Sequence, residues 1–278
     1  MKTIVFLGGG SIASSIIAGL HRAGHKARLV AYDKNPEKPK KLRRQFGIGI
    51  ARTLREAVTH ADVLIIAVRP DNVAALLGEI RSLVPARLDQ KRRAAGQRTS
   101  ARSACSLAAG IPLKRLRAAL PKTFYWARAM PSPTSHSGYG LTALCFESRF
   151  PESQKAIIKN LFGALGPAVK IPERQFDAFT AIYSCTHGYH ALAVLAGAGL
   201  KAGLDRKTAL LAAAHALADG IQVWRNGDSS LDELIKEATT PGGIAASVIR
   251  VMDRHGYARI VENGLLAGIA RAHQNADK

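Results

Sequence analysis

The chain has 278 residues and 47% of them are hydrophobic, so it is long enough for two domains that each bury a core, which excludes an intrinsically disordered protein. It contains no apolar run of about 20 residues and no signal-type N-terminus, so we expect a cytoplasmic protein without a membrane span. Its three cysteines are widely spaced and never form C-x-x-C, which indicates small buried residues and neither a disulfide framework nor a thiolate metal site.

The net charge of +20 comes entirely from the first part of the chain. Residues 1–171 carry 29 basic and 9 acidic side chains, and the remaining residues carry 11 of each. Much of the excess lies in residues 34–44 and 87–102. No aromatic residues are interleaved with these segments, so we do not expect nucleic acid as a partner, and a solvated basic face and an anion site both remain open.

The first predicted element is a strand that turns sharply into a helix. The apolar run Ile4–Leu7 stops at three glycines, and a helical pattern of Ala, Ile and Leu follows at once. Gly8, Gly10 and Ala13 fit the pattern G-x-G-x-x-G/A. In this pattern the first glycine permits the turn, the second lets a pyrophosphate approach the backbone, and the third small residue lets the helix pack closely. We therefore predict a dinucleotide phosphate site at Gly8, Gly10, Ser11, Ile12 and Ala13.

A second strand is predicted over residues 27–33, and it ends at the acid expected to read the ribose of the cofactor. Asp33 lies 23 residues after Gly10, as the dinucleotide-binding fingerprint requires. Lys34 and further basic residues up to Arg44 would attract the 2′-phosphate of NADPH, whereas Asp33 by itself suits the free diol of NADH. We expect NADPH, with NADH as the alternative, and a plain basic surface helix is the other interpretation of the cluster.

Alternating strands and helices continue to about residue 171. A helix is predicted over Leu54–His60, a buried strand over Ala61–Pro70, a helix over residues 71–84 and a later helix over Lys155–Gly166. This alternation is typical of a doubly wound α/β domain with a parallel sheet. We place this Rossmann domain at residues 1–171.

From about Glu173 the pattern changes to long alanine-rich helices without strand-like alternation. Asp205 is a predicted N-cap, and Ser230 with Glu233 forms a capping-box pattern. Helices this apolar would leave large exposed patches on a monomer. We therefore predict an all-α domain over residues 172–278 that forms a homodimer.

The motifs resemble, in order and over nearly the whole chain, those of the pyrroline-5-carboxylate reductase family. The matching stretches are FLGGGSIA, ADVLIIAVRP, SLAAGIPL, ARAMP, GYGLTALCF, FDAFTAI and TTPGG. The resemblance implies a Rossmann domain, a helical dimerisation and substrate domain, assembly into dimers or a ring of dimers, and reduction of a cyclic imine by NAD(P)H. It places along the cofactor Ala67, Val68, Arg69, Pro70, Ala108, Ala109 and Gly110. It places around the substrate carboxylate the loop Thr240, Pro241, Gly242 and Gly243, with its backbone N–H groups.

The chain departs from the family pattern around the expected substrate site. Ser184–Tyr189 stand where the family has G-S-G-P-A-Y, with Ser184 and Thr186 in place of its two glycines and His187 in place of its proline. Ile244 and Ala245 replace two threonines of the family's S-P-G-G-T-T. The Asn of the family's M-P-N-T-P is Ser132 here, and a helix threonine that faces the substrate is His215. The catalytic residue is therefore left open, with the candidates Thr240, His187 and His215.

The basic segment 87–102 makes the connection before SLAAG longer than in the family. It also fills the place of an expected apolar strand with cations, which cannot sit in the middle of a sheet at tolerable cost. We predict a looped-out insertion, with at most residues 104–108 kept as a strand.

The leading functional hypothesis is NAD(P)H-dependent reduction of 1-pyrroline-5-carboxylate to proline, the last step of proline biosynthesis. The altered substrate site leaves two alternatives, a relative that binds nucleotide and dimerises without this activity, and a reductase of a different imine. No metal is predicted, because His187 and His190 lack carboxylates or cysteines at matching spacing.

Overall fold

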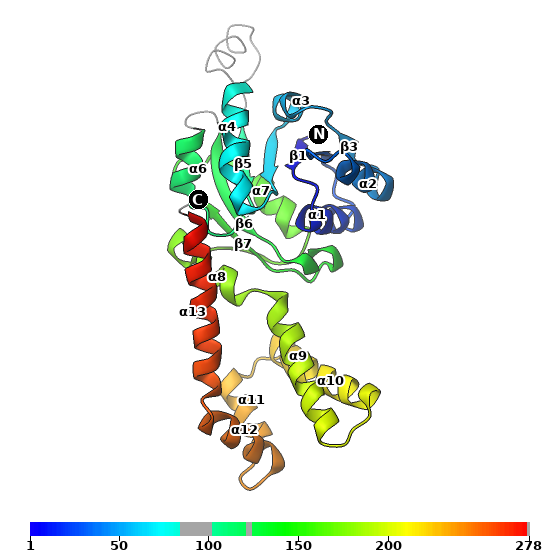
Figure 1. The fold of residues 1–278 in the computed structure, drawn as a ribbon, viewed down its shortest axis with the longest axis vertical. Coiled ribbons are helices and arrows are strands. Elements are labelled where there is room, and N and C mark those ends of the chain that lie inside the picture. The colour runs from blue at the N-terminus through cyan, green and yellow to red at the C-terminus, as the bar shows by residue number, and fades with distance from the viewer. Residues whose placement is uncertain (84–101, 121–123, 277–278) are drawn as a thin grey trace. The chain divides into compact units, whose positions relative to one another are not determined.

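The computed structural model describes residues 1–83, 102–120 and 124–276 (Figure 1). These residues divide into two compact units, which we call unit 1 (Met1–Tyr183 with Gly268–Lys278) and unit 2 (Ser184–Ala267). The domain boundary at residues 171 and 172 stays a prediction.

Among the described residues, unit 1 is built on one sheet of eight strands in the order β3-β2-β1-β4-β5-β6-β7-β8. All neighbouring strands are parallel except β6 and β7, which are antiparallel. The order reverses beside β1, which pairs with β2 on one side and with β4 on the other, so the predicted doubly wound parallel sheet is confirmed. The strand bounds are β1 Thr3–Leu7, β2 Arg28–Tyr32, β3 Gly49–Ile50, β4 Val63–Ile66, β5 Ser103–Ser106, β6 Tyr125–Met130, β7 Thr142–Phe146 and β8 Ala168–Lys170.

Helices cover both faces of this sheet (Figure 1). One face packs against α3 (Leu54–His60), α4 (Val73–Leu83), α6 (Leu113–Ala119) and the start of α8 (Phe176–Ile182). The other packs against α1 (Ser11–Arg22), α2 (Glu37–Phe46) and α7 (Glu152–Gly163). Because both faces are buried, the central strands are continuously apolar, and all four residues of β4 are buried. Short 3₁₀ helices lie at η1 Pro70–Asn72, η2 Pro133–Ser137 and η3 Glu173–Gln175.

The predicted elements of unit 1 are present, with shifted ends. The helix predicted over residues 71–84 begins as a 3₁₀ turn, because Pro70 fixes the backbone at its start, and becomes α-helical at Val73. The helix predicted to end at Gly166 ends at Gly163, and the kept strand lies at Ser103–Ser106 instead of within residues 104–108. The predicted insertion 87–102 lies outside the described residues, apart from Arg102. Cys105 and Cys145 are buried as expected, whereas Cys185 is partly exposed.

Unit 2 consists of α9 (Cys185–Lys201), α10 (Arg206–Asn226), α11 (Leu231–Ala238), α12 (Ile244–Arg254) and the first part of α13 (Tyr257–Ala276). The Asp205 carboxylate accepts hydrogen bonds from the N–H groups of Lys207 and Thr208, and Ser230 and Glu233 form a reciprocal capping box. Both predicted caps are therefore confirmed. Within residues 184–267, the buried residues are Ala196, Ala209 and Ala213. Among the described residues, no helix is both long and apolar enough to cross a membrane.

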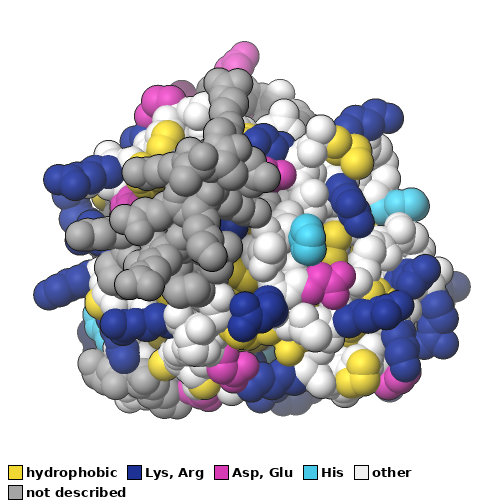
Figure 2. All heavy atoms as spheres, turned by 90° about the horizontal axis from the view of Figure 1, so that it is seen from above, with side chains coloured by type: hydrophobic (Ala, Val, Ile, Leu, Met, Phe, Trp, Pro, Cys, Tyr) yellow, Lys and Arg dark blue, Asp and Glu magenta, His cyan; other side chains and the backbone are white. Residues whose placement is uncertain are grey.

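Basic side chains are spread over the surface that Figure 2 shows. Lys and Arg clearly outnumber Asp and Glu on this face, and several Lys and Arg side chains extend into solvent away from one another. This distribution is typical of a solvated basic face, one of the two interpretations of the charge excess.

Candidate cofactor and substrate sites

The turn between β1 and α1 contains two glycines with different surroundings. Gly8 has φ +110°, and a Cβ there would lie 2.6 Å from the carbonyl oxygen of Ala67 at the end of β4. Gly10 has φ −76° and is the N-cap of α1, and no atom lies within 4 Å of the place where its Cβ would be. The turn therefore needs Gly8 for its own packing, whereas the missing side chain of Gly10 leaves open space.

This open space belongs to a cavity of about 730 Å³ at the carboxyl ends of β1, β2 and β4. It is lined by Leu7, Gly8, Gly10, Ser11, Ile12, Tyr32, Asp33, Lys34, Lys38, Ala67, Val68, Arg69, Asn72, Ala75 and Leu76. Nine of the residues predicted to bind cofactor thus lie around one cavity. Ala13 does not line it, because its side chain is fully buried in the sheet core, and Pro70 begins η1 just outside the lining.

Asp33 ties the glycine turn to the end of β2. Its Oδ2 accepts a hydrogen bond from the N–H of Gly9 at 2.8 Å and contacts Lys38 Nζ at 3.3 Å. Its Oδ1 accepts a hydrogen bond from the N–H of Asn35 at 2.9 Å. Partial burial raises the pKa of Asp33, but the hydrogen bonds from Gly9 and Asn35 and the Lys38 charge outweigh burial and hold its pKa below the ordinary value. The carboxylate is therefore charged at neutral pH.

Only two side chains of the basic segment 34–44 line this cavity, and both contact an acid. Lys34 Nζ lies 2.6 Å from Glu79 Oε1 on α4, and Lys38 is paired with Asp33. Lys40 instead pairs with Glu37 along the exposed side of α2. The sequence pattern pointed to the cationic cluster but gave no sign of Glu79, which lies 45 residues from Lys34.

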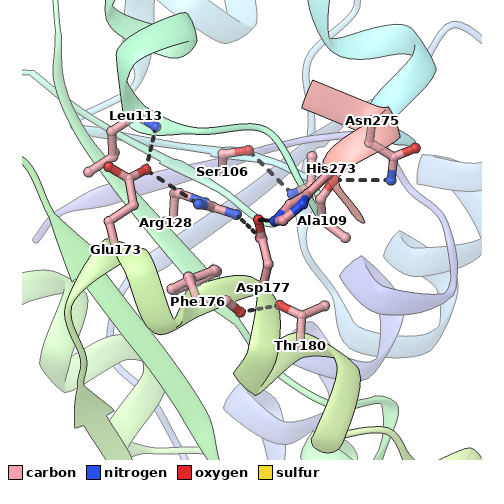
Figure 3. Close-up of polar contacts among 11 residues, drawn as sticks. Ser106, Ala109, Leu113, Arg128, Glu173, Phe176, Asp177, Thr180, His273 and Asn275 are labelled. Atoms are coloured by element: carbon pink, nitrogen blue, oxygen red, sulfur yellow. Dashed lines mark hydrogen bonds and ion pairs between the residues drawn. The ribbon is translucent and has the colours of Figure 1, made fainter. Parts of the chain in front are cut away.

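The predicted cofactor residues Ala108, Ala109 and Gly110 form the loop after β5 and do not line the cavity. The end of α13 packs on this loop (Figure 3). Asn275 Nδ2 donates a hydrogen bond to the carbonyl oxygen of Ala109 at 3.3 Å. Gly110 has φ +78°, and a Cβ there would collide with the carbonyl oxygen of Ala272. The loop is thus held by the last turns of the described chain.

A buried arginine on β6 joins this part of unit 1 to the segment that leads toward unit 2 (Figure 3). Arg128 is 2% exposed, and its guanidinium contacts Glu173 Oε1 at 3.3 Å and Asp177 Oδ1 at 3.1 Å. It also lies 4.2 Å from the ring centre of Phe176. Two carboxylates and an aromatic ring therefore compensate for the removal of this charge from water.

The same two acids hold further segments of unit 1. Glu173 Oε1 accepts a hydrogen bond from the N–H of Leu113 at 2.6 Å, and Asp177 Oδ2 lies 3.7 Å from His273 Nε2 on α13. The sequence pattern did not predict this network. The available signals were a lone arginine in the apolar stretch that became β6, and two acids four residues apart at the start of the helical region.

In unit 2, the predicted substrate loop leads into α12. Gly242 has φ +79°, and the N–H of Gly243 donates to the carbonyl oxygen of Thr240 at 2.9 Å. Gly243 is the N-cap of α12 and has no side chain, so it supplies no side-chain acceptor for the first N–H groups of this helix. An open cavity of about 530 Å³ here is lined by Gly242, Gly243, Ile244, Ser247, Val248, Val251 and Met252. Thr240 and Pro241 do not line it.

The two histidine candidates lie on other helices of unit 2. His215 Nδ1 is 3.0 Å from Asp219 Oδ2, one turn along α10, and both side chains are exposed. His187 lies in the first turn of α9, where its N–H donates to the carbonyl oxygen of Ser184. Within residues 1–83, 102–120 and 124–276, no three His, Cys, Asp or Glu side chains are arranged to hold a metal ion.

Two family models match different parts of the chain. Residues 3–88 match the family described as "NADP oxidoreductase coenzyme F420-dependent", and residues 173–275 match the one described as "Pyrroline-5-carboxylate reductase dimerisation". The chain is also 28% identical to the pyrroline-5-carboxylate reductases of Mycobacterium tuberculosis and Pseudomonas aeruginosa, over 99% of this chain and 97% of each relative. Over nearly its whole length the chain is therefore similar to pyrroline-5-carboxylate reductases, and residues 173–275 match the dimerisation family of these enzymes.

Solved structures of pyrroline-5-carboxylate reductases have this fold. The Plasmodium falciparum pyrroline carboxylate reductase with NADP bound superimposes with a TM-score of 0.84 at 20% identity, covering 99% of this chain and 98% of that one. The Coxiella burnetii pyrroline-5-carboxylate reductase also gives 0.84, at 22% identity and the same coverage. The likeness to these solved structures thus extends over both units, the α/β unit and the helical one.

Proposed function

We infer that this chain reduces 1-pyrroline-5-carboxylate to proline with a nicotinamide cofactor, as an oxidoreductase acting on a C=N bond. One observation carries the inference: a chain with the glycine-lined cavity of unit 1 continues into helices that match the pyrroline-5-carboxylate reductase dimerisation family. The curated relatives at 28% identity are named for this activity over nearly the full length of the chain.

The residues of unit 1 fit a dinucleotide. The open backbone at Gly10 and the N-terminus of α1 suit a pyrophosphate, since anions bind well at helix N-termini. Asp33 and Lys34 lie at the end of β2, where a dinucleotide-binding fold reads the ribose. When bound, a reduced nicotinamide supplies the hydride for the imine carbon. We propose NADPH as the preferred cofactor, supported by Lys34, Lys38 and Arg69 in the lining.

The substrate loop of unit 2 fits a carboxylate. The N–H groups at the start of α12, with the open backbone of Gly242, would hold the carboxylate of pyrroline-5-carboxylate. A proton must reach the imine nitrogen, and Thr240, His187 and His215 remain the candidate donors. Ala245 offers no hydroxyl at the position where the family pattern has a threonine, so we propose normal cofactor binding with slow turnover.

The helical part matches a dimerisation family, so the protein assembles into oligomers. We propose a homodimer through unit 2, or a ring of such dimers, in the cytoplasm. The support within the structure is the set of exposed large apolar side chains on α9, α10 and α12.

The test is oxidation of NADPH by the purified chain, followed at 340 nm with and without pyrroline-5-carboxylate, together with detection of proline. We expect oxidation that depends on this substrate and yields proline, more slowly than the roughly 10 per second of an average enzyme. Tight NADPH binding without any proline formation would support the alternative of a nucleotide-binding relative. Turnover of another cyclic imine only would support the alternative substrate.

A further inference from the structure

Glu79 lies on the rim of the cofactor cavity without lining it. It belongs to α4, where Ala75 and Leu76, four and three residues earlier, do line the cavity and lie on the same side of the helix. Its Oε1 is 2.6 Å from Lys34 Nζ at the end of β2. Glu79 therefore brings a negative charge to the side of the cavity where the ribose acid Asp33 lies.

The charged side chains next to the end of β2 are already paired with one another in the absence of a ligand. Asp33 contacts Lys38 at 3.3 Å, and Glu79 contacts Lys34. Asp33 also accepts the N–H of Gly9, so its pairing is part of the glycine turn itself. The Glu79–Lys34 pair makes no such contact with the turn, and its side chains are 42% and 69% exposed.

We propose that Glu79 determines how strongly this cavity prefers a dinucleotide with a 2′-phosphate, because it competes with that phosphate for Lys34. The inference rests on the proposed function for the identity of the cofactor. An exposed ion pair adds little stability, so Lys34 turns from Glu79 to a phosphate at low cost. The Glu79 carboxylate then remains beside a group that carries about two negative charges and repels it.

This arrangement predicts opposite effects for the two members of the pair. Removing the Glu79 charge frees Lys34 and removes the repulsion, so affinity for NADPH rises. Removing the Lys34 charge leaves Glu79 unpaired beside the phosphate, so affinity for NADPH falls. NADH has a free diol at this position, so its affinity changes little in both cases.

The experiment compares Glu79→Gln with Glu37→Gln, which removes an acid from the similar exposed pair Glu37–Lys40 outside the cavity lining. Dissociation constants for NADPH and NADH are measured by fluorescence titration of the full chain at low and at high salt. We expect Glu79→Gln to bind NADPH about three to ten times more tightly at low salt and NADH within twofold of wild type. Glu37→Gln should leave both constants unchanged, and Lys34→Met should weaken NADPH about tenfold.

Equal changes for NADPH and NADH in Glu79→Gln, or no change in either, would overturn the role of Glu79 and leave the proposed function intact. The same effect in Glu37→Gln would also overturn it, because the gain would then reflect net charge alone. If wild type binds neither cofactor, the proposed function itself fails, and this inference fails with it.

Discussion

Unit 1 buries both faces of its sheet, whereas unit 2 leaves most of its large apolar side chains exposed. Apart from Met1, Tyr139, Val169 and Ile182, all the large hydrophobic side chains that are exposed in the described residues belong to unit 2. The two units also differ in charge, because the excess of basic residues lies in the first 171. Unit 1 thus has a core of its own from one chain, whereas unit 2 has apolar surface that a second copy is suited to cover.

The two candidate sites differ in how far their groups are already held by contacts within the chain. The cavity of unit 1 has its glycine turn, acid and cations already in contact with one another. The predicted substrate loop of unit 2 leads into an exposed helix start, where Ile244 is 87% exposed. We therefore expect substitutions in unit 2 to change turnover and assembly, and substitutions in unit 1 to change cofactor affinity and stability.

The largest effect is expected from restoring the two family threonines on α12. Ile244→Thr together with Ala245→Thr should raise kcat for pyrroline-5-carboxylate about 10²–10³-fold at saturating NADPH, because a hydrogen-bond donor near the imine nitrogen acts in the transition state. The dissociation constant of NADPH should stay the same, since both residues belong to unit 2.

Ala246→Thr is the matched control for this gain, because it adds a hydroxyl one position further along the same helix. A wild-type turnover already near 10 per second, without any increase in the double variant, would show that the missing hydroxyl at Ala245 does not limit turnover.

A second prediction tests whether unit 2 is completed by another copy. Leu210 and Ile221 are exposed on α10 and lie eleven residues apart, which is about three turns and hence one face. Replacing both with Asp would place unpaired charges in an apolar interface, so dimer affinity should fall at least about 10²-fold by analytical ultracentrifugation. Tyr139→Asp, at an exposed apolar site of unit 1, should leave the dimer intact. A wild-type chain that stays a folded monomer at micromolar concentration would show that unit 2 does not need a second copy to cover its apolar surface.

The two glycines of the first turn have different expected roles, Gly8 in packing and Gly10 in ligand binding. Gly10→Ala places a methyl group in the open cavity, so affinity for NADPH should fall about tenfold or more while the melting temperature stays unchanged. Gly8→Ala forces a side chain onto the Ala67 carbonyl at positive φ, so the unfolding free energy should fall by about 1–3 kcal/mol. Calorimetry and fluorescence titration of both variants check this, and equal melting temperatures with equal affinities would show that the two glycines are interchangeable.

The smallest effect concerns Asp33. Because its pKa is lower in the folded chain than in the unfolded chain, its contribution to stability is present above the unfolded value of about 4 and disappears as the pH falls through the folded value. Asp33→Asn should therefore lower the unfolding free energy by about 1 kcal/mol at pH 7, through the weaker hydrogen bond from Gly9. Denaturant titrations at several pH values should show this difference shrinking below pH 4, and a difference that grows in acid would contradict the assignment.

The sequence predicted those elements whose local structure depends on residues that are close together in the chain. The run Ile4–Leu7 and the glycines after it define strand, turn and helix locally, and Asp205 caps α10 through contacts two and three residues away. These features follow from periodicity and capping chemistry within a few residues.

Contacts between distant residues could not be predicted in this way. Arg128 meets Glu173 and Asp177 over 45 and 49 residues, and Lys34 meets Glu79 over 45. Nothing in the local pattern of either segment identifies its partner, because such pairs depend on which strands become neighbours in the sheet. The glycine turn and Asp33 of the candidate cofactor cavity were therefore named from the sequence, whereas the contact of Glu79 with Lys34 became visible only in the fold.

The hydrogen bond from Asn275 to Ala109 joins two residues that are 166 positions apart, and this has a consequence for synthesis. A ribosome that adds about 5–20 residues per second needs roughly 8–30 s to make the chain between them. During that time the sheet of unit 1 can form, but the loop Ala108–Gly110 has no Ala272 or Asn275 to pack against. The last turns of α13 therefore pack on a loop that the ribosome made much earlier.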